Sequence, residues 1–157
     1  MSFEIAHRHL EAKGFADRVQ EFTVSSATVE LAAQALGTRP ERIAKSLTFM
    51  VNDEPVMIVC AGDAKIANAK FKATFHVKAK MLSREEVGTL IGHEVGGVCP
   101  FGVKEGVRVY LDVSLKRFDI VYPACGSDNS AVTLSVEELE QASDALGWVD
   151  VCSIPEA

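Results

Sequence analysis

Apolar positions along the chain occur in short runs that are separated by glycine, proline and small polar residues. Runs that are rich in β-branched and aromatic residues predict strands. The predicted strands cover residues 22–25, 47–51, 56–60, 78–82, 107–111, 120–122, 131–134 and 148–152. Asn52-Asp53-Glu54-Pro55 is a typical turn sequence, so we expect the second and third strands to form a β-hairpin.

Helix starts are marked by capping boxes, in which Ser or Thr precedes Glu by three residues and both side chains satisfy backbone N–H groups. The capping boxes are Thr38 with Glu41, Ser83 with Glu86, and Ser135 with Glu138. Two further helices are predicted from Ser2 to Gly14 and from Thr28 to Gly37, because glycine readily takes the left-handed conformation past a helix end. About five helices among hairpins predict an α+β fold around one mixed sheet.

Length and composition are those of a single globular domain over residues 1–157. Hydrophobic residues make up 48% of the chain and charged residues 24%. The N-terminal segment carries an acid at Glu4 and lacks the layout of a secretory signal, and no apolar run approaches the ~20 residues that span a bilayer. We therefore expect a cytoplasmic protein that does not cross a membrane.

Familiar catalytic and metal-binding motifs are not found in the sequence. The histidines show no HExxH spacing, and GxSxG and Walker-type loops are missing. The cysteines, Cys60, Cys99, Cys125 and Cys152, form no CxxC pair. We therefore expect reduced, mostly buried thiols, no metal site and no cofactor.

Charge is unevenly distributed along the chain. The net charge of −6 argues against a protein that coats nucleic acid indiscriminately. Residues 64–84 nevertheless carry basic side chains and no acid: Lys65, Lys70, Lys72, Lys78, Lys80 and Arg84. This segment is either a solvated lysine-rich helix face or a track that binds phosphate groups.

The glycine-rich segment Gly96-Gly97-Val98-Cys99-Pro100-Phe101-Gly102 has few bulky side chains. Such a backbone lets N–H groups approach a ligand oxygen closely, although an ordinary helix-to-strand turn has a similar sequence. Within it, Cys99 is either a small buried residue or a thiolate nucleophile.

Lys45 follows a predicted short helix and precedes a strand. At a helix C-terminus its charge would complement the helix dipole. Beside a pocket, the same ammonium could hold a carboxylate, a phosphate or an attacking water.

Taken together, these segments resemble the YbaK/EbsC family, which includes the free-standing ProXp deacylases and the editing domain of bacterial prolyl-tRNA synthetases. The matching segments are residues 28–33, 35–37, 42–47, 61–63 and 96–102, and Asp112. The resemblance spans nearly the whole chain. It implies a mixed, largely antiparallel, barrel-like sheet packed with about five helices.

The activity that the resemblance implies is hydrolysis of the ester between a small mischarged amino acid and the terminal adenosine of tRNA, usually the tRNA for proline. Lys45 matches the family's essential lysine, and Gly96 and Gly97 begin the backbone wall that binds the aminoacyl carbonyl. The expected substrate-binding residues are Thr28, Val98, Cys99, Pro100, Phe101, Gly102, Gly126 and Asn129. The candidate tRNA-binding residues are Lys65, Lys70, Lys72, Lys78 and Lys80. The acceptor end of aminoacyl-tRNA is the expected partner, and prolyl-tRNA synthetase is a further candidate.

Two departures from the family leave the amino acid open. Cys99 stands where many relatives carry Ser or another small residue, and residues 125–129 differ from the glycine-rich, often basic sequence common there.

Two alternative functions also stay open. One is a module of the same fold that binds tRNA or a synthetase without hydrolysis. The other is a hydrolase that uses Cys99, which would need a nearby histidine such as His93. The presence of both Lys45 and the intact loop favours the deacylase.

Overall fold

The predicted hairpin is the longest paired element of the structure, a computed structural model that describes residues 2–155. Its strands, β2 (Ile43–Val51) and β3 (Glu54–Ala61), pair antiparallel along their length. Asn52 and Asp53, which join them, have φ angles of 50° and 65°. Positive φ at both central residues is the geometry of a two-residue type I′ turn, which Asn and Asp tolerate. The hairpin is confirmed, and both strands are longer than expected.

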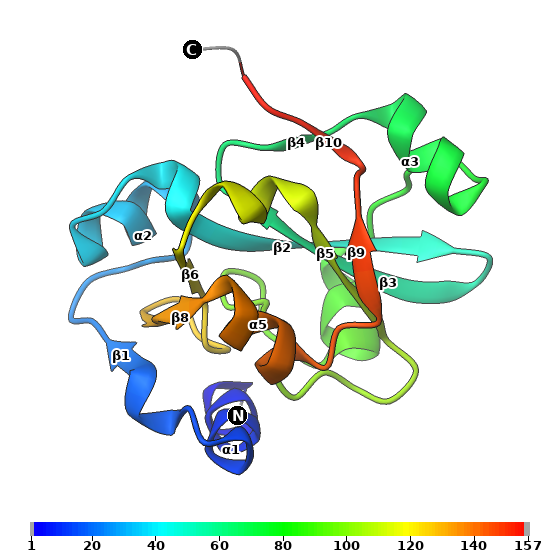
Figure 1. The fold of residues 1–157 in the computed structure, drawn as a ribbon. Helices are drawn as coiled ribbons and strands as arrows, with labels where there is room; N and C mark the ends of the chain where they lie inside the picture. The colour runs from blue at the N-terminus through cyan, green and yellow to red at the C-terminus, as the bar shows by residue number, and fades with distance from the viewer. Residues whose placement is uncertain (1, 156–157) are drawn as a thin grey trace.

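Within residues 2–155, six strands form the main sheet, in the order β8-β6-β2-β3-β5-β9. The remaining members of this sheet are β5 (Arg108–Asp112), β6 (Ile120–Pro123), β8 (Leu134–Ser135) and β9 (Gly147–Val149). Two small antiparallel pairs accompany it, namely β1 (Val19–Glu21) with β7 (Ser130–Val132) and β4 (Lys65–Ile66) with β10 (Cys152–Ser153). Antiparallel pairs outnumber parallel ones over residues 2–155, and the sheet is curled (Figure 1).

Helices pack around this sheet (Figure 1). In the described part of the chain they are α1 (Ser2–Lys13), α2 (Val29–Leu36), α3 (Asn68–Phe75), α4 (Arg84–Glu86) and α5 (Val136–Ser143). A π-helical turn at Val87–Ile91 extends α4, and 3-10 turns lie at Ala16–Arg18, Pro40–Arg42 and Val113–Arg117. Both halves of the capping box form at Ser83 and at Ser135. The predicted α+β fold with about five helices and one mixed main sheet is confirmed.

The third capping box is wrong. Thr38 caps no helix, because the chain makes only one 3-10 turn from Pro40 before Ile43 enters β2. Strand pairing of β2 ends the turn before a helix can propagate. The separate prediction of a helix from Thr28 to Gly37 is confirmed as α2, which Thr28 caps, since its Oγ1 accepts a hydrogen bond from the N–H of Leu31.

Four strand predictions also need correction. Residues 131–134 are divided between β7 and β8, and residues 148–152 are divided between β9 and β10. Residues 22–25 form no strand, since their neighbour β7 begins at Ser130, which pairs with Glu21. The strand therefore lies immediately upstream, at β1. Residues 78–82 contribute only a single bridge, between Met81 and Phe49.

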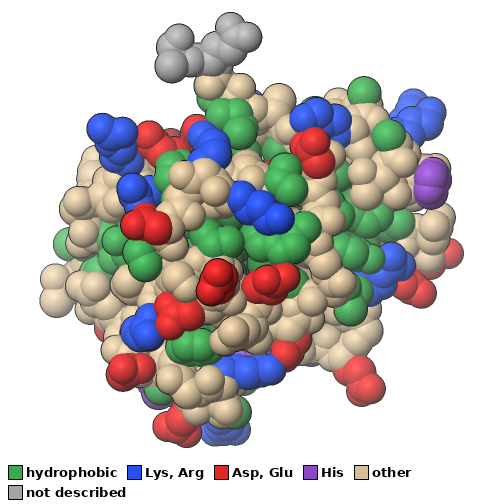
Figure 2. Space-filling model, viewed as in Figure 1, with side chains coloured by type: hydrophobic (Ala, Val, Ile, Leu, Met, Phe, Trp, Pro, Cys, Tyr) green, Lys and Arg blue, Asp and Glu red, His purple; other side chains and the backbone are tan. Residues whose placement is uncertain are grey.

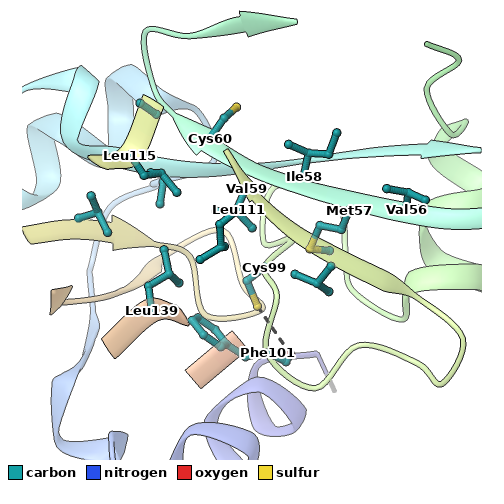
Figure 3. Close-up of a cluster of buried hydrophobic side chains, with 14 of the residues drawn as sticks. Val56, Met57, Ile58, Val59, Cys60, Cys99, Phe101, Leu111, Leu115 and Leu139 are labelled. Carbon is teal, nitrogen blue, oxygen red and sulfur yellow. Dashed lines mark hydrogen bonds between the residues drawn. The ribbon is translucent and has the colours of Figure 1, made fainter. Parts of the chain in front are cut away.

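The core is built on both faces of β3, where Val56 to Ala61 are fully buried. Figure 3 shows Leu111, Leu115 and Leu139 packed on one side of this strand together with Cys99 and Phe101. A smaller apolar cluster of Ala32, Ala33 and Ile43 lies beneath α2. The main core thus supports the centre of the sheet, while α2 rests on its own patch at the start of β2.

A buried hydrogen-bond chain ties α1 to the glycine-rich loop. The imidazole Nε2 of His93 lies 2.7 Å from the carbonyl oxygen of Phe101, which can only accept, so this nitrogen carries the proton. Nδ1 then accepts from the hydroxyl of Ser2, 2.7 Å away, and that hydroxyl accepts in turn from the N–H of Glu94. Ser2 therefore holds the start of the segment that runs from His93 to Phe101, and the His93 side chain links that start to its end.

The state of His93 predicts a pH dependence of stability. Burial is the main cause that lowers the pKa of this imidazole in the folded protein. Below about pH 6.5, His93 of the unfolded chain becomes protonated while His93 of the folded chain stays neutral. The free energy of unfolding therefore falls as the pH drops below that value. We expect His93→Gln, which can keep a neutral donor to Phe101, to weaken this acid dependence. Urea unfolding at several pH values measures this dependence. If the free energy of unfolding fell equally steeply with decreasing pH in both proteins, His93 would not be its source.

Candidate functional site

A pocket of about 230 Å3 opens where the start of α2, the start of β2, the end of β6 and the glycine-rich loop meet. Apolar side chains form more than half of its lining: Ala27, Val29, Ala32, Ile43, Ala44, Val95, Val98, Ala124 and Ala131. The polar residues that line it are Ser26, Thr28, Lys45, Ser46, Tyr122 and Ser130. Among the lining residues in the described part of the chain, Lys45 alone is charged. The pocket thus combines a small apolar space with a single cation.

Lys45 lies within β2, opposite Cys60 of β3, and not at the end of a helix. The dipole explanation for this residue is therefore wrong. Its Nζ donates to the carbonyl oxygens of Gly62 at 3.2 Å and Ala64 at 2.6 Å. An ammonium has three hydrogens, so one remains for a ligand.

The turn that holds Lys45 is itself fixed by close contacts. A Cβ on Gly62 would lie 2.0 Å from the carbonyl oxygen of Pro40, so only glycine fits there. The carboxylate of Asp63 forms a two-point ion pair with Arg117. The Arg117 hydrogen bonds are the main cause that lowers the pKa of Asp63, and the charge of Lys45 contributes least. Asp63 therefore braces the turn through Arg117.

The glycine-rich loop forms part of the pocket wall. Gly96 and Val98 line the pocket, and neither N–H donates to another group within residues 2–155. Gly97 lies between them, but its N–H donates to the carbonyl of Glu94 at 2.9 Å. A Cβ on Gly97 would lie 2.4 Å from the backbone nitrogen of Ser127, which explains why glycine is needed there. Of the predicted loop glycines, Gly96 therefore reaches the pocket and Gly97 packs behind it.

The second half of the loop points away from the pocket. Cys99, Pro100 and Phe101 are buried, and Gly102 packs against Ile5 of α1. Figure 3 shows Cys99 beside Phe101 in the core. These residues were expected to bind substrate, and the structure instead places them in the support of the loop.

The chemistry of Cys99 follows from this position. Burial raises the pKa of its thiol far above the ordinary value. His93 lies close, with 3.6 Å between Nε2 and Sγ, but that nitrogen donates its proton to Phe101. The two side chains therefore contribute packing and hydrogen bonding, and His93 is not placed as a base for a Cys99 nucleophile.

Three further predicted residues are divided between two hollows. Thr28 lines the pocket and caps α2. Gly126 packs against the carbonyl of Ser2, and the amide of Asn129 donates to the carbonyl of Phe22. Both line a different hollow beside α1.

The lysine-rich segment is exposed but not uniform. Lys72 and Lys78 line a shared hollow on α3 and the residues after it. Lys70 instead donates to the carboxylate of Asp150 and to the carbonyl of Cys152. Lys65 and Lys80 are exposed. On the face shown in Figure 2, basic side chains lie over the α3 region and are otherwise interspersed with acidic ones.

Sequence reasoning did not single out Ser46 or Tyr122. The Oγ of Ser46 is buried and has no hydrogen-bond partner among the described residues. Its position directly after Lys45 in the sequence could have indicated a residue of the same site. Tyr122 reaches the pocket only because β6 pairs with the start of β2. No local sequence pattern predicts the pairing of β6 with β2.

Two further findings concern residues 2–155. No three His, Cys, Asp or Glu side chains in this range gather as metal ligands would. No helix in it is long and apolar enough to cross a membrane.

Comparisons with known proteins agree with this architecture. A solved structure of a proposed trans-editing enzyme for prolyl tRNA synthetase superposes with a TM-score of 0.87 at 27% identity, covering 97% of each chain. Uncharacterized protein YwhH of Bacillus subtilis is 52% identical over 153 residues, which are 97% of this chain and 98% of that protein. The proline--tRNA ligase of Halalkalibacterium halodurans is 34% identical over 109 residues, 69% of this chain but only 19% of the ligase. The family model for the aminoacyl-tRNA editing domain matches residues 23–142, and the chain belongs to that family.

Proposed function

We propose that this protein is an aminoacyl-tRNA deacylase that acts in trans, removing a small mischarged amino acid from tRNA, with the tRNA for proline as its substrate. The observation that carries the proposal is the Lys45 ammonium, the single charge of a small apolar pocket, which keeps one hydrogen for a ligand. Since aminoacyl-tRNA is used in the cytoplasm, the protein would act there.

The proposed chemistry needs no metal and no nucleophilic side chain. The ester carbonyl would lie against the N–H groups of Gly96 and Val98, which are free to stabilise the negative charge that develops on its oxygen. Lys45 would orient the attacking water or the terminal ribose. Because a positioned ester is already activated, orientation and oxyanion stabilisation can supply much of the acceleration. Water adds to the carbonyl carbon, and the ribose oxygen leaves with a proton.

Pocket size supports a small amino acid. Alanine and valine side chains make up much of the wall around a volume of about 230 Å3. Each methylene that a substrate gains or lacks in such a pocket changes the discrimination between two amino acids by about 1–3 kcal/mol. The proline--tRNA ligases among the relatives support the tRNA for proline as the carrier, and prolyl-tRNA synthetase as a partner.

Lys45 provides the direct test of this proposal. We expect Lys45→Ala to fold and to lose deacylation of Ala-tRNA for proline, because the ammonium positions reactants and does not pack the core. Lys45→Arg should also lose most activity, since a planar guanidinium places its donors differently. Lys104→Ala is the matched control, because that ammonium also donates to a carbonyl, of Thr89, away from the pocket. Wild-type turnover by a folded Lys45→Ala variant would refute the catalytic assignment.

Lys72 and Lys78 test the proposed path of the tRNA. Replacing both by Ala should raise the apparent KM and leave turnover at saturation little changed. It should also make the plot of log affinity against log salt concentration less steep, by about 1–2 in slope. Lys70→Ala is the comparison, because Asp150 already neutralises that ammonium, and it should change KM less. Deacylation rates against tRNA concentration at several ionic strengths measure the effect. An unchanged KM and salt slope in the double variant would move the tRNA path elsewhere.

Cys99 separates this mechanism from a thiolate mechanism. We expect Cys99→Ala to lower stability, because it opens space in the core, and to keep turnover per folded molecule. Alkylating reagents should not inactivate the native protein, since the thiol is fully buried. Complete loss of activity in a folded Cys99→Ala variant would favour the nucleophilic alternative.

A further inference from the structure

Ser46 carries a buried hydroxyl that has no hydrogen-bond partner in the described part of the chain. The other serine and threonine hydroxyls of the pocket are engaged. Ser26 donates to the carbonyl of Ser130, Thr28 caps α2, and the hydroxyls of Ser130 and Ser127 lie 2.6 Å apart. Ser46 is therefore the exception within its own pocket.

An unsatisfied buried hydroxyl costs stability, so its presence calls for an explanation. Alanine at position 46 would avoid that cost without leaving a large void. Because the hydroxyl makes no hydrogen bond, turning it about χ1 toward the pocket breaks none. An unsatisfied hydroxyl on a residue that lines the pocket and directly follows Lys45 in the sequence is suited to a ligand.

The charge of the pocket restricts what that ligand group can be. Lys45 precedes Ser46, and the described lining residues include no carboxylate to offset its charge. A second cation, such as the α-ammonium of an amino acid, would be repelled from this part of the wall. The Lys45 charge therefore disfavours a cation as the partner of Ser46, and the hydroxyl groups of an aminoacyl-adenosine are groups that can both donate and accept a hydrogen bond.

We propose that Ser46 is a substrate-contacting residue whose hydroxyl binds a neutral hydroxyl of the aminoacyl-adenosine end. This inference rests on the proposed function and deepens it. The hydroxyl has two potential sources, the side chain of the amino acid or the ribose. If it is the side chain, the pocket prefers seryl over alanyl substrates of nearly the same size, since a site that hydrogen-bonds a hydroxyl discriminates against the analogue that lacks it.

The test combines stability with binding. Ser46→Ala should raise the melting temperature by about 2–4 °C, because it removes an unsatisfied group. The same change should weaken binding by about tenfold, the effect of one neutral hydrogen bond. The probes are amide-linked seryl and alanyl 3′-aminoadenosines, which cannot be hydrolysed as esters, and their 2′-deoxy forms. Calorimetric titration measures the affinities.

The pattern of affinities identifies the source of the hydroxyl. Loss with the seryl probe alone indicates the side chain, whereas loss with both probes that disappears in the 2′-deoxy forms indicates the ribose. Ser46→Thr, which keeps a hydroxyl, should restore binding. Ser143→Ala is the control, because its buried hydroxyl donates to Glu140 on α5, and it should lower stability without changing affinity.

Two results would overturn the inference. One is a lower melting temperature in Ser46→Ala, and the other is unchanged affinity for every probe. Binding of the probes by a wild-type protein that hydrolyses no ester would refute the proposed deacylase and leave the Ser46 contact intact. The two failures are therefore distinguishable.

Discussion

Two backbone carbonyls decide where the charge of Lys45 lies in the pocket. Gly62 and Ala64, in the turn after β3, accept hydrogen bonds from Lys45 and hold its flexible side chain in one orientation. The turn can do this because the absence of a Cβ at Gly62 lets it approach Pro40. β3 in turn is held at the centre of the core, so the position of the ammonium depends on the best-packed part of the molecule.

The opposite wall of the pocket is fixed by backbone packing. Gly97 lies against the turn at Ser127, and Gly126 lies against the carbonyl of Ser2, both closer than a Cβ would allow. His93 adds hydrogen bonds to the same region. A loop held from behind in this way keeps a fixed backbone beside the pocket, and a fixed backbone is what oxyanion stabilisation requires.

Local patterns in the sequence were sufficient for the features that depend on nearby residues. The hairpin turn at Asn52 and Asp53, the capping boxes at Ser83 and Ser135, and the end of α2 at Gly37 were all predicted correctly. The failures involve distant partners. The strand near residue 22 is misplaced because its extent is set by β7, more than a hundred residues away in sequence. The same dependence on distant contacts explains why the predicted site residues do not all meet. The pocket is lined by Lys45, Gly96, Val98 and Thr28, while residues 99–102 pack behind it. Glycine-rich sequence indicates a tight backbone but not which of its residues faces a ligand.

The central claim, that the pocket hydrolyses aminoacyl esters, is tested most directly by measuring amino acid release from a panel of tRNAs for proline charged with alanine, serine, cysteine or proline. The account predicts that the wild-type protein releases at least one of the small mischarged amino acids well above the spontaneous rate and leaves prolyl-tRNA intact. Binding of these tRNAs with no release above the spontaneous rate would contradict it and would make the protein a binding module of the editing fold.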